Sequence, residues 1–225
     1  MSRIERVCDG LDGCYGRQEW ERGKPILDEL IYTILSQNTS AKNCDEAFRE
    51  LSERFPTWAD VMTARPGDIA EAIRTGGLAN RKAPRIKQIL EEVFERQGSL
   101  DLEWIADAPD PEAIDYLLGF DGVGRKTAAC VLMFGLGKPV LPVDTHVHRV
   151  AVRLGLIGHV SADATHDLLQ AMFAHPEPVE GRVYSFHVNM VAHGRQVCHA
   201  RAPECAKCAI NKECDYLAEQ ARAGR

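Results

Sequence analysis

Four cysteines near the carboxyl end constrain this chain more than any other feature. They follow the spacing C-x6-C-x2-C-x5-C, at Cys198, Cys205, Cys208 and Cys214. Four thiolates in one short segment can hold a structural zinc ion or an iron–sulfur cluster. Zinc modules usually combine two closely spaced pairs, and only Cys205 and Cys208 form such a pair. The wide gaps favour a loop around a centre larger than one ion, so the spacing predicts a [4Fe–4S] cluster, with zinc as the alternative.

The rest of the composition is that of an ordinary globular protein. The chain has 225 residues, of which 45% are hydrophobic and 27% charged, enough for one large or two modest domains. No apolar stretch follows Met1 that would make a secretion signal, and no apolar run is long enough to span a membrane. We therefore expect a cytoplasmic protein, where thiols stay reduced and metal ligation is favoured over disulfides.

Positive charge is concentrated in segments of a chain whose formal net charge is −6. Residues 72–90 hold only basic charges, at Arg74, Arg81, Lys82, Arg85 and Lys87. Residues 122–162 hold Arg125, Lys126, Lys138, Arg149 and Arg153 against Asp144 alone, and residues 182–225 are also more basic than acidic. If these segments share a face, they form a basic groove for nucleic acid. The alternative is that each is a solvated helix face.

Apolar residues recur at helical spacing through most of the chain, which predicts an all-α fold. Ser40 can cap a helix that ends before Pro56, and paired glycines stop another at residues 76–77. The expected helices cover 25–35, 40–55, 68–75, 83–97, 111–118, 124–134, 145–154, 165–173, 183–193 and a short segment from 214.

A Gly122-Val123-Gly124 turn between two of these helices indicates a helix-hairpin-helix. Glycines allow a tight hairpin, and the free amides at the start of the next helix form an anion site suited to a DNA phosphate. The alternative is an ordinary αα-turn. Arg125 and Lys126, directly after the glycines, favour the DNA-binding interpretation.

Lys126 and Asp144 are the candidate catalytic residues. The positive end of a helix and the neighbouring Arg125 both disfavour the ammonium form of Lys126, and a neutral lysine amine can form a Schiff base. Asp144 directly precedes a helical pattern, so it is either an N-cap or a carboxylate that faces the same cleft and supports this chemistry. His146 and His148 follow it, but histidines on a helix more often pack or contact phosphate than catalyse.

Three motifs in this order make the chain similar to the endonuclease III family. They are Gly-Val-Gly-Arg-Lys-Thr-Ala, then Val-Asp-Thr-His-Val-His-Arg-Val, then His-Gly-Arg-Gln-Val-Cys with the four-cysteine spacing. The family is the iron–sulfur branch of the helix-hairpin-helix DNA glycosylases, and the resemblance covers roughly residues 26–216. It implies a six-helix barrel domain at 24–133, with the helix-hairpin-helix at about 112–134. It also implies a cluster domain from 1–23 plus 134–225, a DNA cleft between the two domains, and a [4Fe–4S] cluster rather than zinc.

The resemblance also implies a reaction. Lys126 matches the lysine that attacks C1′ of the damaged nucleotide, and Asp144 matches the essential aspartate. The expected enzyme is a bifunctional DNA glycosylase and AP lyase that removes oxidised pyrimidines and cuts the abasic strand by β-elimination. Its expected partner is double-stranded DNA with a damaged base or an abasic site, bound by a monomer that is associated with the nucleoid if bacterial.

Base extrusion needs residues that fill the vacancy in the duplex. The resemblance places them in Leu35–Thr39, where Gln37 or Asn38 fills the hole, and at Leu78, which presses from the opposite strand. Loop packing is the alternative for Leu78. The remaining expected DNA contacts are Gly122, Val123, Gly124 and Arg125 in the hairpin, Arg201 and Lys207 beside the cysteines, and the basic segments around 74–87 and 125–153.

Some alternatives remain open at this stage. One is a related glycosylase for mismatched or alkylated bases, although Lys126 argues against relatives that remove bases without cutting the strand. Another is a non-catalytic, cluster-bearing DNA-binding module. Asp121 stands where the family usually has a proline, and it puts a negative charge next to the expected phosphate site.

Overall fold

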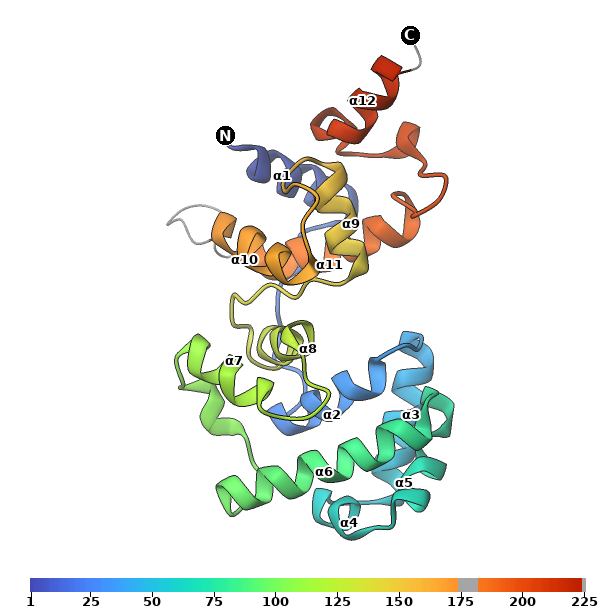
Figure 1. Cartoon of the computed structure of the whole chain (residues 1–225), viewed down its shortest axis with the longest axis vertical. Helices are drawn as coiled ribbons and strands as arrows, with labels where there is room; N and C mark the ends of the chain where they lie inside the picture. Colours follow the sequence, from blue (N-terminus) through green and yellow to red (C-terminus); the bar gives the residue numbers. More distant parts are fainter. Residues whose placement is uncertain (174–181, 224–225) are drawn as a thin grey trace. The chain divides into compact units, whose positions relative to one another are not determined.

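A computed structural model describes residues 1–173 and 182–223 of the chain, and in these ranges every regular element is helical. The predicted all-α fold class is confirmed. The described residues separate into two compact units, residues 22–138 and residues 1–21 with 139–225 (Figure 1). That the first unit is the barrel domain and the second the cluster domain stays a prediction. In the described ranges, no helix combines the length and the apolar character needed to cross a membrane.

The unit 22–138 is built around one largely buried helix, α2 (Ile26–Ser36). Its apolar side chains leave almost no surface exposed, and α3, α6, α8 and η3 all pack against it. The elements after α2 are α3 (Ala41–Arg54), α4 (Trp58–Thr63), α5 (Pro66–Ala72), η1 (Arg74–Gly76), α6 (Ala79–Gln97), η2 (Glu103–Ala106), α7 (Asp110–Leu118), α8 (Arg125–Cys130) and η3 (Val131–Gly135).

In the other unit, α11 (Val183–Gln196) packs against both α1 (Arg3–Tyr15) and α9 (Thr145–Arg153). The crossing with α9 is close, because a Cβ added at Gly194 would lie 2.8 Å from the Cβ of His146. Arg182, just before α11, donates to Asp9 at 2.7 Å and to Asp12 on α1. The remaining elements are α10 (Ala162–Phe173), η5 (Cys205–Lys207), η6 (Asn211–Glu213) and α12 (Asp215–Ala223).

Two helices were missing from the sequence-based prediction, α1 and α4. Both begin with a capping box, in which Ser2 pairs with Glu5 and Thr57 with Asp60. These pairs are a sequence signal that could have found them. α4 buries only Val61 and so has no apolar pattern, whereas the buried residues of α1, Ile4, Val7, Cys8 and Leu11, do recur at helical spacing.

Several predicted helix boundaries were wrong. The helix expected at 165–173 begins at Ala162, and the one expected at 183–193 continues to Gln196. The helix expected at 83–97 begins at Ala79, with Leu78 as its N-cap and Pro84 inside it. The helix expected at 68–75 is the α-helix α5 followed by the 3-10 turn η1. The helix expected at 124–134 changes after Cys130 into a π-helical turn, Val131–Gly135. Tertiary packing decides these local changes of pitch, and the spacing of apolar residues in the sequence does not predict them.

Candidate functional site

The hairpin between α7 and α8 turns at a position where only glycine fits. Gly122 has a φ of +77°, which side chains rarely adopt. A Cβ added there would lie 2.1 Å from Nε of Arg85 on α6. The guanidinium of Arg85 therefore rests directly on the turn, and Arg85 and Gly122 fix each other.

The hairpin keeps two backbone amides unpaired. The N–H of Val123 donates to Phe120 O at 3.1 Å, and the Val123 side chain is buried at 5% exposure. Val123 thus shapes the turn, and neither its amide nor its side chain is free for DNA, contrary to expectation. Within the described residues, the N–H groups of Gly124 and Lys126 have no backbone partner. Amides at the start of a helix can bind a phosphate oxygen.

Asp121, the acidic residue beside the hairpin, is close to a cation. Its Oδ2 lies 3.6 Å from Nη2 of Arg85. The pair is partly exposed and contributes little to stability, but it offsets the negative charge that the sequence places next to the candidate phosphate site.

Lys126 is the second residue of α8 and is half-buried. Its ammonium makes no ion pair or hydrogen bond with the described residues. Its neighbour Thr127 is buried and accepts a hydrogen bond from Nε2 of Gln37 at 3.4 Å, while the same amide donates to Gly122 O at 3.4 Å. The structure therefore secures the backbone around Lys126 and leaves its amine available for a ligand.

Asp144 caps α9, as one of its two interpretations predicted. Its Oδ1 accepts the backbone N–H of His146 and of Val147, both at 2.8 Å. Its Oδ2 has no hydrogen-bond partner in the part of the chain that the structure describes. The segment before it is anchored as well, because His187 donates to Pro142 O at 2.9 Å and the backbone of Leu141 is held by a glutamine side chain. One carboxylate oxygen thus holds the start of α9, and the other has no partner among the described residues.

Asn38 and Leu78 both protrude from their loops. Asn38 is exposed with a φ of 56°, and Leu78 is 47% exposed with a φ of 51°. Gln37 lies beside Asn38 but is half-buried, and its amide is directed to the hairpin. The exposure of Leu78 argues against the alternative that it packs in its loop.

Strained backbone marks two of the expected DNA contacts and the neighbour of a third. Among the described residues other than glycine, a positive φ occurs at Asn38, Leu78 and Ala202. Two of these are predicted DNA contacts, and Ala202 follows a third, Arg201. A left-handed backbone costs an L-residue about 1–2 kcal/mol and tends to persist at functional sites.

The basic segment 72–90 is not the uniform DNA footprint that the sequence predicted. Lys82 is only 2% exposed and cannot reach a phosphate. Lys87 is half-buried and donates to Met62 O, and Arg85 covers the hairpin. Arg74 and Arg81 are exposed, and both line a shallow depression with Leu78. These two arginines are the members of the segment that remain suited to DNA contact.

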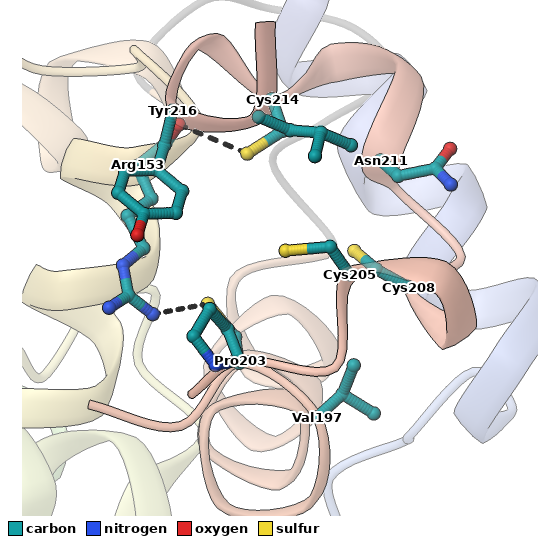
Figure 2. Close-up of a pocket in the computed structure, with 10 residues that line it drawn as sticks. Arg153, Val197, Pro203, Cys205, Cys208, Asn211, Cys214 and Tyr216 are labelled. Atoms are coloured by element: carbon teal, nitrogen blue, oxygen red, sulfur yellow. Dashed lines mark hydrogen bonds between the residues drawn. The ribbon is translucent and has the colours of Figure 1, made fainter. Parts of the chain in front are cut away.

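The four predicted metal ligands line one pocket (Figure 2). The sulfur atoms of Cys205, Cys208 and Cys214 point into it, while Cys198 accepts a hydrogen bond from Arg153 Nη1 at 3.2 Å. In the described residues, no three potential ligands are grouped closely enough for a single metal ion. Four sulfurs that line one pocket are the donor set of a [4Fe–4S] cluster, and a zinc ion held by four thiolates takes the same set.

The surroundings of the pocket keep two of its cysteines protonated in the absence of a metal. Burial raises the pKa of Cys208 to about 11 and also raises the pKa of Cys214, so both are neutral thiols without a metal. Binding them as thiolates would release protons. Burial lowers the pKa of His193 to about 4, so this ring is neutral near pH 7. With Tyr15 OH donating to Nδ1 at 2.9 Å, Nε2–H can donate to the Cys208 sulfur at 3.4 Å.

Two arginines on α9 hold the loop 198–214, which we call the cysteine loop. Arg149 donates to Cys198 O at 2.9 Å and to Gly194 O at 2.8 Å. Arg153 donates to His199 O at 2.7 Å, and its guanidinium lies over the ring of Tyr216. The sequence-based reading did not identify these roles, because a helical arginine gives no sign of which carbonyls it will meet. The ring of His146 also accepts from Arg149, consistent with packing rather than catalysis.

Arg201 and Lys207 are both exposed on the cysteine loop. Lys207 forms an ion pair with Glu204 that is open to solvent. Such pairs are weak and exchange readily, so both cations can still reach a DNA backbone.

The hairpin geometry predicts that alanine destabilises the protein much more at Gly122 than at Gly124. Gly122→Ala should lower the free energy of unfolding by about 1–3 kcal/mol in urea denaturation, because the new methyl group meets Arg85 at a positive φ. Gly124→Ala is the matched control. A Cβ at Gly124 meets nothing within 4 Å, and its φ is −94°, so its effect should stay within about 0.5 kcal/mol. Equal losses in both variants would contradict the assigned fit.

Known proteins share this arrangement. Residues 31–174 match the family described as HhH-GPD superfamily base excision DNA repair protein. Endonuclease III of Thermotoga maritima is 34% identical over 83% of this chain and 81% of that protein, and endonuclease III of Sulfolobus acidocaldarius is 33% identical over 85% and 82%. A solved non-covalent complex of endonuclease III with DNA superposes with a TM-score of 0.80 at 25% identity and covers 99% of both chains.

A more distant relative indicates how widely the module is used. The DNA glycosylase/AP lyase ROS1 of Arabidopsis thaliana is 29% identical over 95% of this chain, which corresponds to 17% of that protein. These relatives confirm the expected enzyme class, a DNA N-glycosylase and AP lyase. The chain belongs to the HhH-GPD superfamily of base excision DNA repair proteins and, within it, to the endonuclease III family.

Proposed function

We propose that this protein removes oxidised pyrimidines from double-stranded DNA and cleaves the abasic strand through a Schiff base on Lys126. The observation that carries the proposal is the position of Lys126. Its amine has no protein partner among the described residues, and it lies in the first turn of the second helix of the helix-hairpin-helix. Similarity to endonuclease III supports it. We expect a monomer that acts in the compartment that holds the DNA.

Lys126 would supply the nucleophile. Its nitrogen lone pair attacks C1′ of the extruded nucleotide, and the bond from C1′ to the base breaks with the base as leaving group. The sugar ring opens to give an imine between C1′ and the lysine nitrogen. Loss of a proton from C2′ then expels the 3′ phosphate by β-elimination, and water hydrolyses the imine. The imine acts as the electron sink for the elimination, so both stages depend on one amine.

Asp144 would act through its unbonded oxygen. Since Oδ1 is held by two backbone amides, the carboxylate cannot turn away from the start of α9. The proposed role of Oδ2 is to stabilise positive charge that develops on the sugar as the base departs, or to keep the lysine amine unprotonated. The N-cap and the chemistry thus use different oxygens of the same side chain.

We propose that Asn38, rather than Gln37, fills the position of the extruded base. Asn38 is exposed on a left-handed turn, whereas the amide of Gln37 braces Gly122 and Thr127. Leu78 is proposed to press on the opposite strand. Extruding a base costs a few kcal/mol, and a damaged pair costs least. Holding two loops in strained conformations before DNA arrives avoids part of the ordering cost at binding.

A [4Fe–4S] cluster is proposed on Cys198, Cys205, Cys208 and Cys214. Such a centre would cross-link the cysteine loop and could exchange one electron. Residues of the chain itself would then position the loop and contact the DNA. Arg149 and Arg153 fix the loop to α9, and the exposed Arg201 and Lys207 are offered to the DNA backbone.

Trapping with borohydride tests the covalent chemistry. Wild-type protein incubated with abasic-site DNA should give a stable adduct after reduction, because borohydride converts the imine to an amine. Lys126→Ala should lose the adduct altogether. Lys42→Ala, at an exposed lysine on α3, serves as control and should trap like wild type. If cluster-loaded wild type binds DNA without forming an adduct, the alternative of a non-catalytic binding module holds.

A panel of duplexes tests the substrate. Thymine glycol and dihydrouracil should be excised at least about tenfold faster than uracil mismatches or 8-oxoguanine, measured as single-turnover rates. Fastest excision of a mismatched or alkylated base would instead assign the chain to the related-glycosylase alternative, with Lys126 chemistry unchanged.

Metal analysis tests the cofactor. Purified protein should be yellow-brown and contain about four iron atoms and four sulfides per chain. Cys205→Ser should lose the colour and most of the iron. Cys14→Ser, at an exposed cysteine outside the set, should keep both. A colourless protein with one zinc ion per chain would overturn the cluster in favour of zinc.

A further inference from the structure

Lys82 is a buried lysine that links two loops of the unit 22–138. It lies in the first turn of α6 and is 2% exposed. Its Nζ donates to Leu35 O at 2.6 Å and to Gly76 O at 3.0 Å. These two carbonyls are far apart in the sequence, so one side chain ties together segments that the backbone does not connect.

Each carbonyl lies a short distance before one of the protruding residues, Asn38 or Leu78. Leu35 lies in the last turn of α2, just before the loop that carries Asn38. Gly76 ends η1, and Gly77 and Leu78 follow it. Lys82 therefore holds the root of each loop, and neither Asn38 nor Leu78 can shift without straining a hydrogen bond to the same ammonium.

Packing leaves little freedom in this arrangement. A Cβ added at Gly76 would lie 3.0 Å from the Cβ of Ala47 on α3 and 4.0 Å from Leu35 O. The end of η1 is thus pressed against α3 and the end of α2. Carbonyls at helix ends lack partners within the helix and attract cations, and Lys82 fills this role for both ends at once.

The free-energy cost of burying an ammonium indicates that the hydrogen bonds of Lys82 are needed in this position. Burial of an ammonium is unfavourable unless its protons are bonded, and desolvation lowers the pKa of Lys82. In the described ranges it has no carboxylate partner. The nearby thiol of Cys44 is itself buried, which raises the pKa of Cys44 to about 11 and keeps it neutral. An apolar residue would avoid these costs, but it would leave two buried carbonyls unpaired.

We propose that Lys82 is a positioning residue for base extrusion, which sets Asn38 and Leu78 in fixed relation so that they enter the duplex together. The inference rests on the proposed function, because it assigns those two residues to the opened duplex. Lys82 itself touches neither DNA nor the reacting atoms.

The test compares substrates that do and do not require extrusion. Lys82→Met keeps the length of the side chain and removes its donors. Its excision rate on a thymine glycol duplex should fall about ten- to hundredfold. Its borohydride trapping on a single-stranded oligonucleotide with an abasic site, where no base pair is opened, should stay within about twofold of wild type.

Lys87→Met is the matched control. Lys87 lies on the same helix and also donates to a backbone carbonyl, that of Met62, which belongs to neither loop. Both of its activities should match wild type. An equal loss of both activities in Lys82→Met would indicate a general structural role and overturn the proposal, as would unchanged duplex excision.

Amide hydrogen exchange tests the clamp without reference to activity. In Lys82→Met, exchange should accelerate at residues 36–40 and 76–79 and remain unchanged in α7 and α8. If wild type lacks glycosylase and lyase activity, the proposed function fails while this result still decides whether Lys82 holds the loops.

If Lys82→Met does not fold, Gly76→Ala displaces the same carbonyl through its contact with Ala47 and should give the same local acceleration. Unaltered exchange in both loops would refute the clamp.

Discussion

The burial of the apolar side chains of α2 is the constraint on which the unit 22–138 depends. Ile26, Leu30, Ile31, Ile34 and Leu35 show no exposed surface, and each such side chain contributes about 1.5–3 kcal/mol when buried. Because α3, α6, α8 and η3 all pack on this one helix, its position sets theirs. The residues proposed for DNA and for catalysis in this unit lie at the edges of that packing.

The end of α2 shows how a core helix becomes a functional element. Its last carbonyls lack partners in the helix, and Lys82 satisfies one of them. Directly after it, Gln37 turns toward the hairpin and Asn38 turns outward. The same few residues therefore close a helix, brace the hairpin that carries Lys126 and present a side chain to the solvent. Stability and function share the hydrogen bonds here, so substitutions in this region should affect both.

In the other unit, α9 likewise carries both a proposed catalytic residue and residues that hold a neighbouring loop. Asp144 begins the helix, and Arg149 and Arg153 hold the cysteine loop by its carbonyls. Gly194 lets α11 approach closely enough for Arg149 to reach its target. A catalytic candidate and the support of a metal-ligand set are thus mounted on one rigid helix. We infer that loss of the contacts between the cysteine loop and α9 would shift Asp144, because Asp144 caps the same helix.

Several features of the sequence were informative because their physics is local. Helical periodicity predicted the fold class, Ser40 and Asp144 were predicted caps, and the spacing of the cysteines predicted a common ligand set that the structure gathers around one pocket. The glycines of the hairpin likewise announced a turn that requires positive φ at Gly122. Each of these depends on a few neighbouring residues, and a short stretch of chain carries that information.

Where predictions from the sequence were wrong, the contact that determines a residue's burial comes from a segment distant in the chain. The basic residues of segment 72–90 look alike in sequence, yet Lys82 is buried, Arg85 covers Gly122 and Arg81 is exposed. Nor could the sequence choose between Gln37 and Asn38. By itself it determined an all-helical chain with a hairpin, offered a cap as one of two roles for Asp144, and predicted that four cysteines act together. Only the tertiary structure decided which lysine is buried, which amide protrudes and which carbonyls the arginines meet, because burial and hydrogen bonding of long polar side chains depend on partners brought near by folding.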